Sequence, residues 1–411
     1  MKLSIDEQLA RIRAHTVEII PEDELVRKLV SGRPLRVKLG VDASGPDIHL
    51  GHAVVLRKLR VFQDLGHRAV MIVGDFTGMI GDPSGRSDTR RQLSRAQVEA
   101  NIADYREQVF KILDPEKTEF RYNSEWLGKL TPEQIMRLAA THTVAQLLAR
   151  DDFAKRYAAQ QPIGLHEFLY PILQGYDSVA IHADIEIGGT DQTFNFLVAR
   201  ELQRNNPLGE PQEAQCIVTF PLLVGTEGVE KMGKSLGNYI GVTVSPDDMF
   251  GKIMSIPDEA LEQYFELCTD VPAADTEQML TDMKCGALNP RDAKRRLAKE
   301  IVTLYHSAEA AEQADETFLR VFSGSREQTL EDYAALADEV AIPADMRGRP
   351  VWASTAIHRL GLAKTKSDAA RLVKAGAVHL DERQLSDPQE EVVFAAGMLV
   401  RVGKRRVARL V

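Results

Sequence analysis

The chain has 411 residues, of which 44 % are hydrophobic and 27 % are charged, and its formal net charge is −9. This length exceeds what one hydrophobic core usually supports, so we expect two or three domains. The sequence has no apolar run long enough to span a bilayer, and the first residues lack the apolar core of a signal peptide. The three cysteines, Cys216, Cys268 and Cys285, are widely spaced. They argue against a disulfide framework and favour a reducing, cytoplasmic location.

The charge is unevenly distributed along the chain. From Met346 to the end there are 13 Lys and Arg against 6 Asp and Glu, a net charge of +7, so the rest of the chain carries −16. A basic appendage on an acidic body is typical of proteins that contact a phosphate backbone. A solvated charged surface is the alternative interpretation of this segment.

The first part of the chain predicts an α/β core. Residues 1–33 are expected to form a charged, amphipathic helical lead-in. Strands are then predicted at 35–41 and 69–74, joined by a helix over 53–65. Both strands are short and apolar, as in a buried parallel sheet. A right-handed crossover places both strand ends at one edge, where open α/β sheets bind ligands.

The loop after the first strand contains His49-Leu50-Gly51-His52. It lies before a helix, where backbone N–H groups and the positive end of the helix dipole favour an anion. Gly51 would let a flat nucleobase lie against the backbone, and two imidazoles would add donors beside a phosphate. Ordinary turn residues are the alternative for so short a pattern.

A glycine-rich loop over 74–85 is expected to leave from the same edge of the sheet. In it, Asp82 (or Asp75) would hold the ammonium group of a ligand. The alternative is that the aspartates cap turns within the loop.

The segment 86–149 is predicted to be mostly helical, and a helix after it carries Tyr170, Gln174 and Asp177. These positions are i, i+4 and i+7, so they share one helix face between apolar residues. Such a face suits the wall of a pocket in which a few polar groups orient a ligand. An exposed polar face is the alternative.

A loop with two lysines is predicted later in the chain. The segment 186–192 is expected to be a glycine turn entering a helix, and a buried strand is expected over 216–224. The loop after this strand contains Lys231-Met232-Gly233-Lys234-Ser235. Two lysines among glycines predict a mobile clamp for a polyphosphate, with a basic surface loop as the alternative.

The remainder is predicted to be helical and highly charged over 244–322. Its most basic segment, 289–299, is either a solvated helix face or an RNA contact. An acidic linker over 326–348 and a compact basic module over 349–411 follow. The module is expected to contain two helices and three short strands, at 354–360, 367–374, 392–394, 398–402 and 406–411.

Together these segments resemble bacterial tyrosyl-tRNA synthetases, which are class I aminoacyl-tRNA synthetases. His49-Leu50-Gly51-His52 matches the HIGH signature, and Lys231-Met232-Gly233-Lys234-Ser235 matches KMSKS with Gly in place of the central Ser. The Tyr-Gln-Asp helix and the Gly-Gly-Thr-Asp-Gln segment look like the tyrosine pocket of that family. The chain has no GxGxxG dinucleotide fingerprint.

The resemblance implies an α/β fold with three functional parts. These are a Rossmann-like parallel-sheet catalytic domain over 1–230, a helical anticodon-side domain over 231–325 and a small α+β RNA-binding domain over 349–411. A helical insert near 120–190 implies a homodimer. The implied reaction joins L-tyrosine and ATP, with Mg²⁺, to give tyrosyl-adenylate and pyrophosphate, and then transfers the tyrosyl group to tRNA(Tyr). No membrane partner is implied.

The resemblance also implies the site residues. The catalytic groups are His49, His52, Lys231 and Lys234. ATP contacts are these four with Gly51, Asp191, Met232 and Ser235. Tyrosine contacts are Asp42, Thr77, Asp82, Tyr170, Gln174, Asp177 and Gln192. No metal ligand of the protein is implied.

The phenol end of the pocket carries one departure from the family. Asp177 is expected to accept the phenol hydroxyl, so that bound phenylalanine would leave a buried carboxylate unpaired. Many bacterial members have a tyrosine where this chain has Lys38, which leaves the second phenol donor open.

Three other functions compete with this interpretation. A tryptophanyl-tRNA synthetase shares both signatures, but Asp177 beside Tyr176 favours a phenol over an indole. A catalytically inactive RNA-binding or splicing module would lack the signature histidines and lysines, and these are present. An unrelated nucleotidyltransferase would need no basic C-terminal appendage.

Overall fold

The computed structural model describes residues 3–42, 45–84, 93–322, 337–343, 345–403 and 406–411, without the side chains of Ser235 and Asp338. Predictions for the Ser235 side chain and for 326–336 therefore lie outside the described residues. The chain divides into two compact units, Met1–Thr243 with Ile256–Ala287, and Val244–Ser255 with Leu288–Val411.

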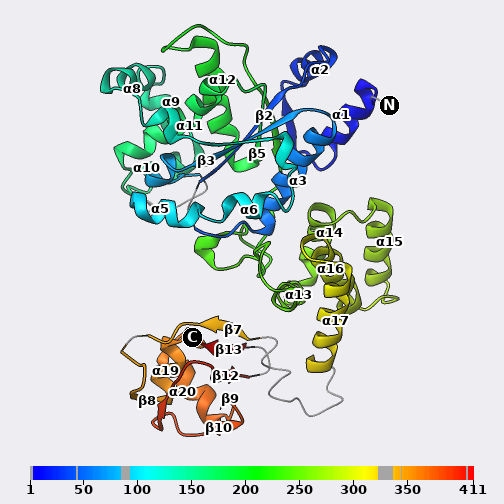
Figure 1. The fold of residues 1–411 in the computed structure, drawn as a ribbon, viewed down its shortest axis with the longest axis vertical. Coiled ribbons are helices and arrows are strands. Elements are labelled where there is room, and N and C mark those ends of the chain that lie inside the picture. The colour runs from blue at the N-terminus through cyan, green and yellow to red at the C-terminus, as the bar shows by residue number, and fades with distance from the viewer. Residues whose placement is uncertain (1–2, 43–44, 85–92, 323–336, 344, 404–405) are drawn as a thin grey trace. The chain divides into compact units, whose positions relative to one another are not determined.

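A largely parallel sheet forms the centre of the first unit (Figure 1). Its strands are β1 (Glu18–Ile20), β2 (Arg36–Asp42), β3 (Arg68–Gly74), β4 (Thr118–Tyr122), β5 (Ile185–Gly189) and β6 (Cys216–Phe220). The spatial order is β1-β6-β5-β2-β3-β4, with β1 antiparallel to β6 and the other pairs parallel. β3 and β6 are almost wholly buried, which explains their continuous apolar sequences. The predicted parallel α/β sheet is confirmed.

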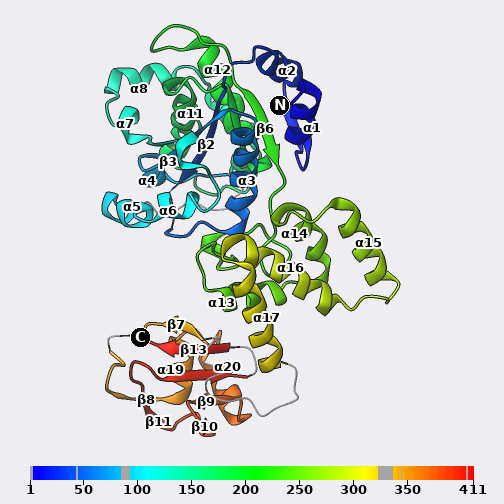
Figure 2. The same cartoon turned by 45° about the vertical axis from the view of Figure 1, so that its right-hand side comes forward.

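Two crossovers run in opposite directions from the middle of this sheet. α3 (Leu50–Asp64) connects β2 to β3, and α12 (Thr193–Asn205) connects β5 to β6. Right-handed crossovers of opposite direction place their helices on opposite faces, as Figures 1 and 2 show. The strand order therefore reverses between β2 and β5, where a crevice forms at the carboxyl ends. The described pairing of β2 with β5 ends at Lys38 and Glu186, beyond which the strands separate.

The other helices of the first unit are mostly short. They are α1 (Ile5–Arg13), α2 (Glu22–Val30), α4 (Thr77–Ile80), α5 (Arg95–Ile102), α6 (Tyr105–Val109), α7 (Ser124–Leu127), α8 (Pro132–Ala139), α9 (Val144–Leu148), α10 (Asp151–Ala158), α11 (Leu165–Ala180), α14 (Leu261–Cys268) and α15 (Ala273–Lys284). α8 begins at Pro132, because Thr131 and Gln134 form a capping box and proline suits the first helical position.

Some sequence-based boundaries are wrong for local reasons. α3 begins at Leu50 rather than at 53, because the His52 ring accepts a hydrogen bond from the His49 backbone N–H (3.3 Å) and closes the first turn. β6 ends at Phe220 rather than at 224, because Pro221 has no N–H to continue the ladder.

Other segments were assigned to the wrong element. The expected glycine turn over 186–192 is strand β5 followed by a 3₁₀ turn, Thr190–Gln192. Gly188 serves packing there, since a Cβ atom would lie 2.6 Å from the Phe196 ring. The predicted helical segments 1–33 and 86–149 contain β1 and β4, which their surrounding helical periodicity conceals.

The second unit has a helical part and a C-terminal module. The helices α13 (Pro246–Met254), α16 (Pro290–Tyr305) and α17 (Ala308–Phe322) confirm the helical character predicted there. α14 and α15, from the same predicted segment, belong instead to the first unit. No helix in the described part of the chain combines the length and apolar character needed to cross a bilayer.

The C-terminal module is α+β, as predicted. Its elements are β7 (Asp338–Val340), β8 (Pro350–Trp352), α19 (Ala353–Arg359), α20 (Lys366–Lys374), β9 (Val378–Leu380), β10 (Arg383–Leu385), β11 (Glu391–Val393), β12 (Leu399–Val402) and β13 (Arg406–Leu410). One sheet has the order β10-β9-β12-β13-β7, and β8 pairs with β11. Ile342 and Met346 are buried in its core, so the module begins before the expected boundary at 349.

Candidate active site

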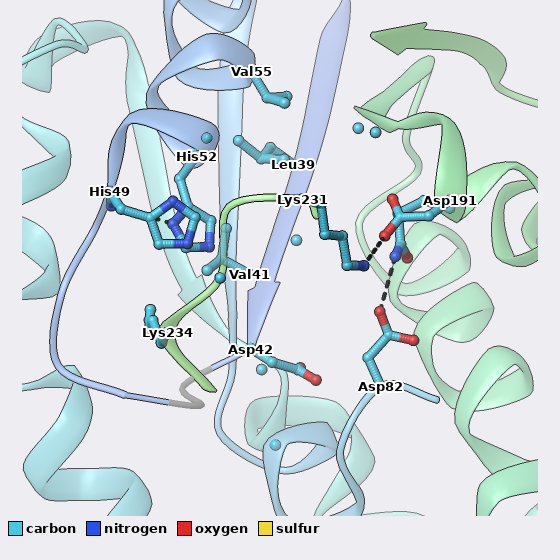
Figure 3. Close-up of a pocket in the computed structure, with 18 of the residues that line it drawn as sticks. Leu39, Val41, Asp42, His49, His52, Val55, Asp82, Asp191, Lys231 and Lys234 are labelled. Atoms are coloured by element: carbon cyan, nitrogen blue, oxygen red, sulfur yellow. Dashed lines mark hydrogen bonds and ion pairs between the residues drawn. The ribbon is translucent and has the colours of Figure 1, made fainter. Parts of the chain in front are cut away.

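A cavity of about 1220 Å³ opens at the carboxyl ends of β2, β3 and β5 (Figure 3). Every predicted site residue whose side chain is described lines it. These residues are Asp42, His49, Gly51, His52, Thr77, Asp82, Tyr170, Gln174, Asp177, Asp191, Gln192, Lys231, Met232 and Lys234. The volume exceeds the roughly 300–1,000 Å³ of a typical small-molecule pocket, so the cavity has room for two substrates.

Two imidazoles stand together at the start of α3 (Figure 3). The ring centroids of His49 and His52 are 3.8 Å apart. Burial, together with the nearby charge of Lys234, lowers the pKa of His49 to about 3, and burial also lowers the pKa of His52 well below its ordinary value. Both rings are therefore neutral near pH 7. Among the described residues His49 Nδ1 has no hydrogen-bond partner, which leaves it available to a ligand.

Gly51 lets the first signature approach the later lysine loop closely. A Cβ atom at Gly51 would lie 3.1 Å from the His49 ring and 3.6 Å from Met232 Cβ. A larger residue would separate these groups. The sequence pointed to Gly51 for ligand approach, and the structure adds this contact between the two signatures.

The lysine loop is anchored at both ends. Met232 N–H donates to the Leu223 carbonyl (2.8 Å) at its start. At its end, Leu50 N–H donates to the Ile240 carbonyl (2.9 Å), and Val242 N–H donates to the Ile48 carbonyl (2.8 Å). The loop therefore returns directly to the backbone that carries the histidines.

Both signature lysines contact protein groups. Lys231 Nζ lies 2.7 Å from Asp191 Oδ2 on the opposite side of the cavity (Figure 3). Lys234 Nζ donates to the Gly45 carbonyl (2.9 Å) and lies 4.9 Å from the ring centroid of buried Tyr105. Two cations thus border the same cavity as the two imidazoles. A basic surface loop does not describe this arrangement.

Two carboxylates organise the middle of the cavity. Asp42 accepts hydrogen bonds from Thr77 (2.8 Å) and Tyr170 (3.0 Å). Asp82 accepts from Gln192 (2.8 Å) through one oxygen.

Asp82 also caps its own turn, because its other oxygen accepts from the Ser84 N–H (2.9 Å). Burial opposes ionisation of Asp82, but the charge of Arg150 and the Ser84 hydrogen bonds outweigh it and lower its pKa. Ligand contact and turn capping, which the sequence presented as alternatives, are compatible in one side chain.

The polar trio of α11 lines the cavity, so the exposed polar face is ruled out as its description. Asp177 is 2 % exposed and accepts from Trp126 Nε1 (2.7 Å) and Asn123 Nδ2 (3.2 Å). The expectation that Asp177 would be unpaired without a phenol hydroxyl is therefore wrong. Burial raises the pKa of Asp177 to about 7, against the charge of Lys38. Among the described residues Gln174 Oε1 has no hydrogen-bond partner.

Sequence reasoning missed Asn123, Trp126 and Tyr105. Asn123 joins two parts of the site, because its amide donates both to Asp177 and to Thr77 Oγ1 (2.9 Å). The alternation of polar and aromatic residues over 118–122 is a strand signal that could have revealed the end of β4, directly before Asn123.

The family model for class I tRNA synthetases (W and Y) matches residues 30–323 of this chain, a range that contains these site elements. The chain is a class I tRNA synthetase of this group. A protein named tyrosine–tRNA ligase from Moorella thermoacetica is 49 % identical to the synthetase, covering 100 % of this chain and 97 % of the relative. A protein of the same name from Carboxydothermus hydrogenoformans is also 49 % identical, covering 98 % and 97 %.

Solved structures share the fold of the synthetase. A C-terminally truncated mitochondrial tyrosyl-tRNA synthetase from Coccidioides posadasii has a TM-score of 0.60 at 24 % identity, covering 77 % of this chain and 92 % of that one. Tyrosyl-tRNA synthetase from Archaeoglobus fulgidus, complexed with L-tyrosine, has a TM-score of 0.60 at 23 % identity, covering 76 % and 100 %.

Proposed function

We propose that this synthetase is a tyrosine–tRNA ligase. It joins L-tyrosine and MgATP to form tyrosyl-adenylate and pyrophosphate, and then transfers the tyrosyl group to the 3′-terminal ribose of tRNA(Tyr). The observation that carries the proposal is the single cavity that holds two neutral imidazoles, two ammonium groups and the polar face of α11. The full-length relatives named tyrosine–tRNA ligase support tyrosine over tryptophan.

The triphosphate occupies the side of the cavity bordered by the two signatures. His49, His52, Lys231 and Lys234 contact the phosphates, where negative charge moves toward the leaving pyrophosphate. Hydrogen bonds and charge that strengthen as this charge develops lower the barrier. A neutral imidazole still carries one ring N–H, so each histidine can donate one hydrogen bond to a phosphate oxygen. Mg²⁺ enters with the nucleotide as part of the substrate.

The nucleoside part of ATP lies against the backbone between the signatures. Gly51 and Met232 contact the base, with Ser235 as a further contact of the loop. Asp191 accepts a hydrogen bond from a ribose hydroxyl, and for this it must give up its ion pair with Lys231.

Tyrosine lies along α11. Asp82, Tyr170 and Gln174 hold its ammonium group, which supplies a donor for the unsatisfied Gln174 Oε1. Asp177 accepts the phenol hydroxyl at the other end.

Asp42, Thr77 and Gln192 complete the tyrosine site. Thr77 donates a hydrogen bond to Asp42, and Gln192 donates one to Asp82. Thr77 and Gln192 thus fix the orientation of the two carboxylates that touch the substrate.

The reaction needs no covalent intermediate on the protein. A carboxylate oxygen of tyrosine attacks the α-phosphorus of ATP, and the bond to pyrophosphate breaks. A ribose hydroxyl of tRNA then attacks the tyrosyl carbonyl, and AMP leaves. The site contributes positioning of the two substrates and electrostatic stabilisation.

The parts outside the cavity serve tRNA binding and assembly. The helical part of the second unit and the basic C-terminal module contact tRNA(Tyr), for which the net charge of +7 after Met346 provides attraction. The helical insert forms a homodimer interface. It carries large hydrophobic side chains that are more than half exposed, namely Met136, Val144, Tyr157 and Leu165.

A cytoplasmic location is consistent with the cysteines. Cys216, Cys268 and Cys285 are all free in the structure.

Amino-acid-dependent ATP–pyrophosphate exchange tests the proposed function. The purified full chain is assayed with each of the twenty amino acids. We expect rapid exchange with tyrosine and far slower exchange with phenylalanine or tryptophan. Exchange with tryptophan alone would overturn the choice of substrate. Charging of total tRNA with labelled tyrosine tests the second step.

A further inference from the structure

Lys38 is a fully buried lysine directly beneath the proposed tyrosine site. Its exposed fraction is 0 %, and it lies on β2 in register with Glu186 on β5. This pair is the last described rung before the two strands separate. Residues of β2 and β5 beyond the rung line the cavity, including Leu39 and Ile187.

The ammonium group of Lys38 connects the sheet to α11. Lys38 Nζ lies 2.8 Å from Glu186 Oε1, and it donates to Ser178 Oγ (2.8 Å) and to the Gln174 carbonyl (3.0 Å). Glu186 is held in turn by Ser178 (3.1 Å) and by Gln215. All three N–H groups of the Lys38 ammonium thus have an acceptor. Two of the acceptors belong to the turn of α11 that carries Gln174 and Asp177.

Burial raises the pKa of Asp177 to about 7, and three contacts act against burial by favouring the ionised form: Lys38, Trp126 and Asn123. Both of its oxygens accept N–H donors, from Trp126 and Asn123, and these hydrogen bonds favour the carboxylate. The charged groups facing it are Lys38 from β2 and Glu186 from β5. The charge of Lys38 lowers the pKa of Asp177, and the weaker influence of Glu186 raises it.

We propose that Lys38 is a positioning and specificity residue for the phenol end of tyrosine: it fixes the α11 turn that carries Gln174 and Asp177, and its charge favours the carboxylate form of Asp177. Lys38 itself does not touch the substrate. Its effect reaches tyrosine through Asp177, and so it favours tyrosine, which has a hydroxyl to donate, over phenylalanine. The inference rests on the proposed tyrosine activation.

The alternative is that Lys38 has a purely structural role and only neutralises the charge of Glu186. Removing Lys38 alone leaves a buried, uncompensated carboxylate, which can destabilise the fold. Removing both charges avoids this, because replacing a whole buried ion pair is often neutral for stability. The decisive variant is therefore Lys38→Met/Glu186→Gln, with Lys38→Met measured beside it.

The experiment measures ATP–pyrophosphate exchange in the full chain with tyrosine and with phenylalanine. For the double variant we expect the KM for tyrosine to rise at least tenfold, with the KM for ATP and kcat changed less than threefold. The preference for tyrosine over phenylalanine should fall at least tenfold. The pH midpoint of kcat/KM for tyrosine should also move upward, because the charge that lowers the pKa of Asp177 is lost.

Lys58→Met is the matched control. Lys58 is also a buried lysine, 7 % exposed, and it donates to the Arg11 carbonyl outside the cavity (3.0 Å). We expect its KM for tyrosine to stay within twofold of the wild type. An unchanged tyrosine KM in the double variant, or an equal rise in Lys58→Met, would overturn the role of Lys38. A wild-type chain that does not activate tyrosine would instead overturn the proposed function.

Discussion

Lys231 and Asp191 form an ion pair across the cavity, with Lys231 Nζ 2.7 Å from Asp191 Oδ2. Both side chains are proposed nucleotide contacts. MgATP must therefore separate them, and the ammonium group then passes from a carboxylate to a phosphate. In the structure the pair links the lysine loop to the 3₁₀ turn Thr190–Gln192 that follows β5.

Replacing Lys231 by Ala should slow adenylate formation while sparing tyrosine binding. Loss of one group that stabilises developing charge costs about 3–4 kcal/mol, or roughly 10²–10³-fold in kcat. Exchange kinetics at varied tyrosine and ATP measure this, and the KM for tyrosine should stay within about threefold. Lys284→Ala, on the exposed surface of α15, is the control. A rate within threefold of wild type would remove Lys231 from the mechanism.

The neutral histidines make the fold sensitive to acid. Because burial holds the pKa of His49 at about 3, the unfolded chain binds a proton below pH 6.5 that the folded chain does not. The stability contributed by His49 is therefore complete above pH 6.5 and is lost as the pH falls toward 3. His49→Gln should flatten this part of the stability curve, measured by urea unfolding at intervals of pH. A slope identical to that of wild type would contradict a neutral His49.

Asp177 should produce the opposite pH dependence of stability. Its pKa of about 7 in the folded chain is above its ordinary 3.8, so the folded chain retains a proton that the unfolded chain has released. This stability is present below about pH 4 and is lost as the pH rises to about 7. Asp177→Asn should remove that slope in urea unfolding, and Asp184→Asn, whose carboxylate has a lowered pKa outside the cavity, is the control.

The ionised form of Asp177 should also govern catalysis. We expect kcat/KM for tyrosine in the exchange assay to rise with pH around 7, because the ionised carboxylate is the form that accepts a hydrogen bond from the phenol hydroxyl. Asp177→Asn should lower kcat/KM for tyrosine by roughly 10–100-fold, as expected for a hydrogen bond to a charged group. The value for phenylalanine should change less. Retained discrimination between the two amino acids would place the phenol elsewhere.

Removal of the C-terminal module should separate the two reaction steps. The truncation belongs after Phe322, the end of α17, because Ile342 and Met346 are part of the core of the module. We expect exchange to be preserved and tRNA charging to fall at least tenfold, with a weaker salt dependence of the residual charging. Charging at the wild-type rate would show that the module does not bind tRNA during the reaction.

The sequence predicted the parts of the site that depend on local spacing. Tyr170, Gln174 and Asp177 share a face because the helical repeat alone determines it. The two signatures were recognised because each lies within a few consecutive residues. Their approach to one cavity followed from the rule that ligands bind at the carboxyl ends of parallel strands.

Contacts between distant segments could not be predicted in this way. Asn123 reaches Asp177 only because β4 ends beside β3, and Lys38 meets Glu186 only through the register of β2 and β5. β5 itself was mistaken for a turn because Gly188 and Gly189 weaken its strand pattern. Their small size is explained by Phe196 and Leu222, which pack where Cβ atoms would otherwise be.

The backbone hydrogen bonds at Ile48 and Leu50 restrict the travel of the lysine loop. Because 240–242 is fastened to the segment that carries His49, and Met232 is fastened to Leu223, the loop is a tether of fixed length. Lys234 lies between the fastened points, so its backbone can move only as far as that length allows. The number of residues between the two fastened points therefore limits how far Lys234 can move from the histidines, and a lengthened loop would relax that limit.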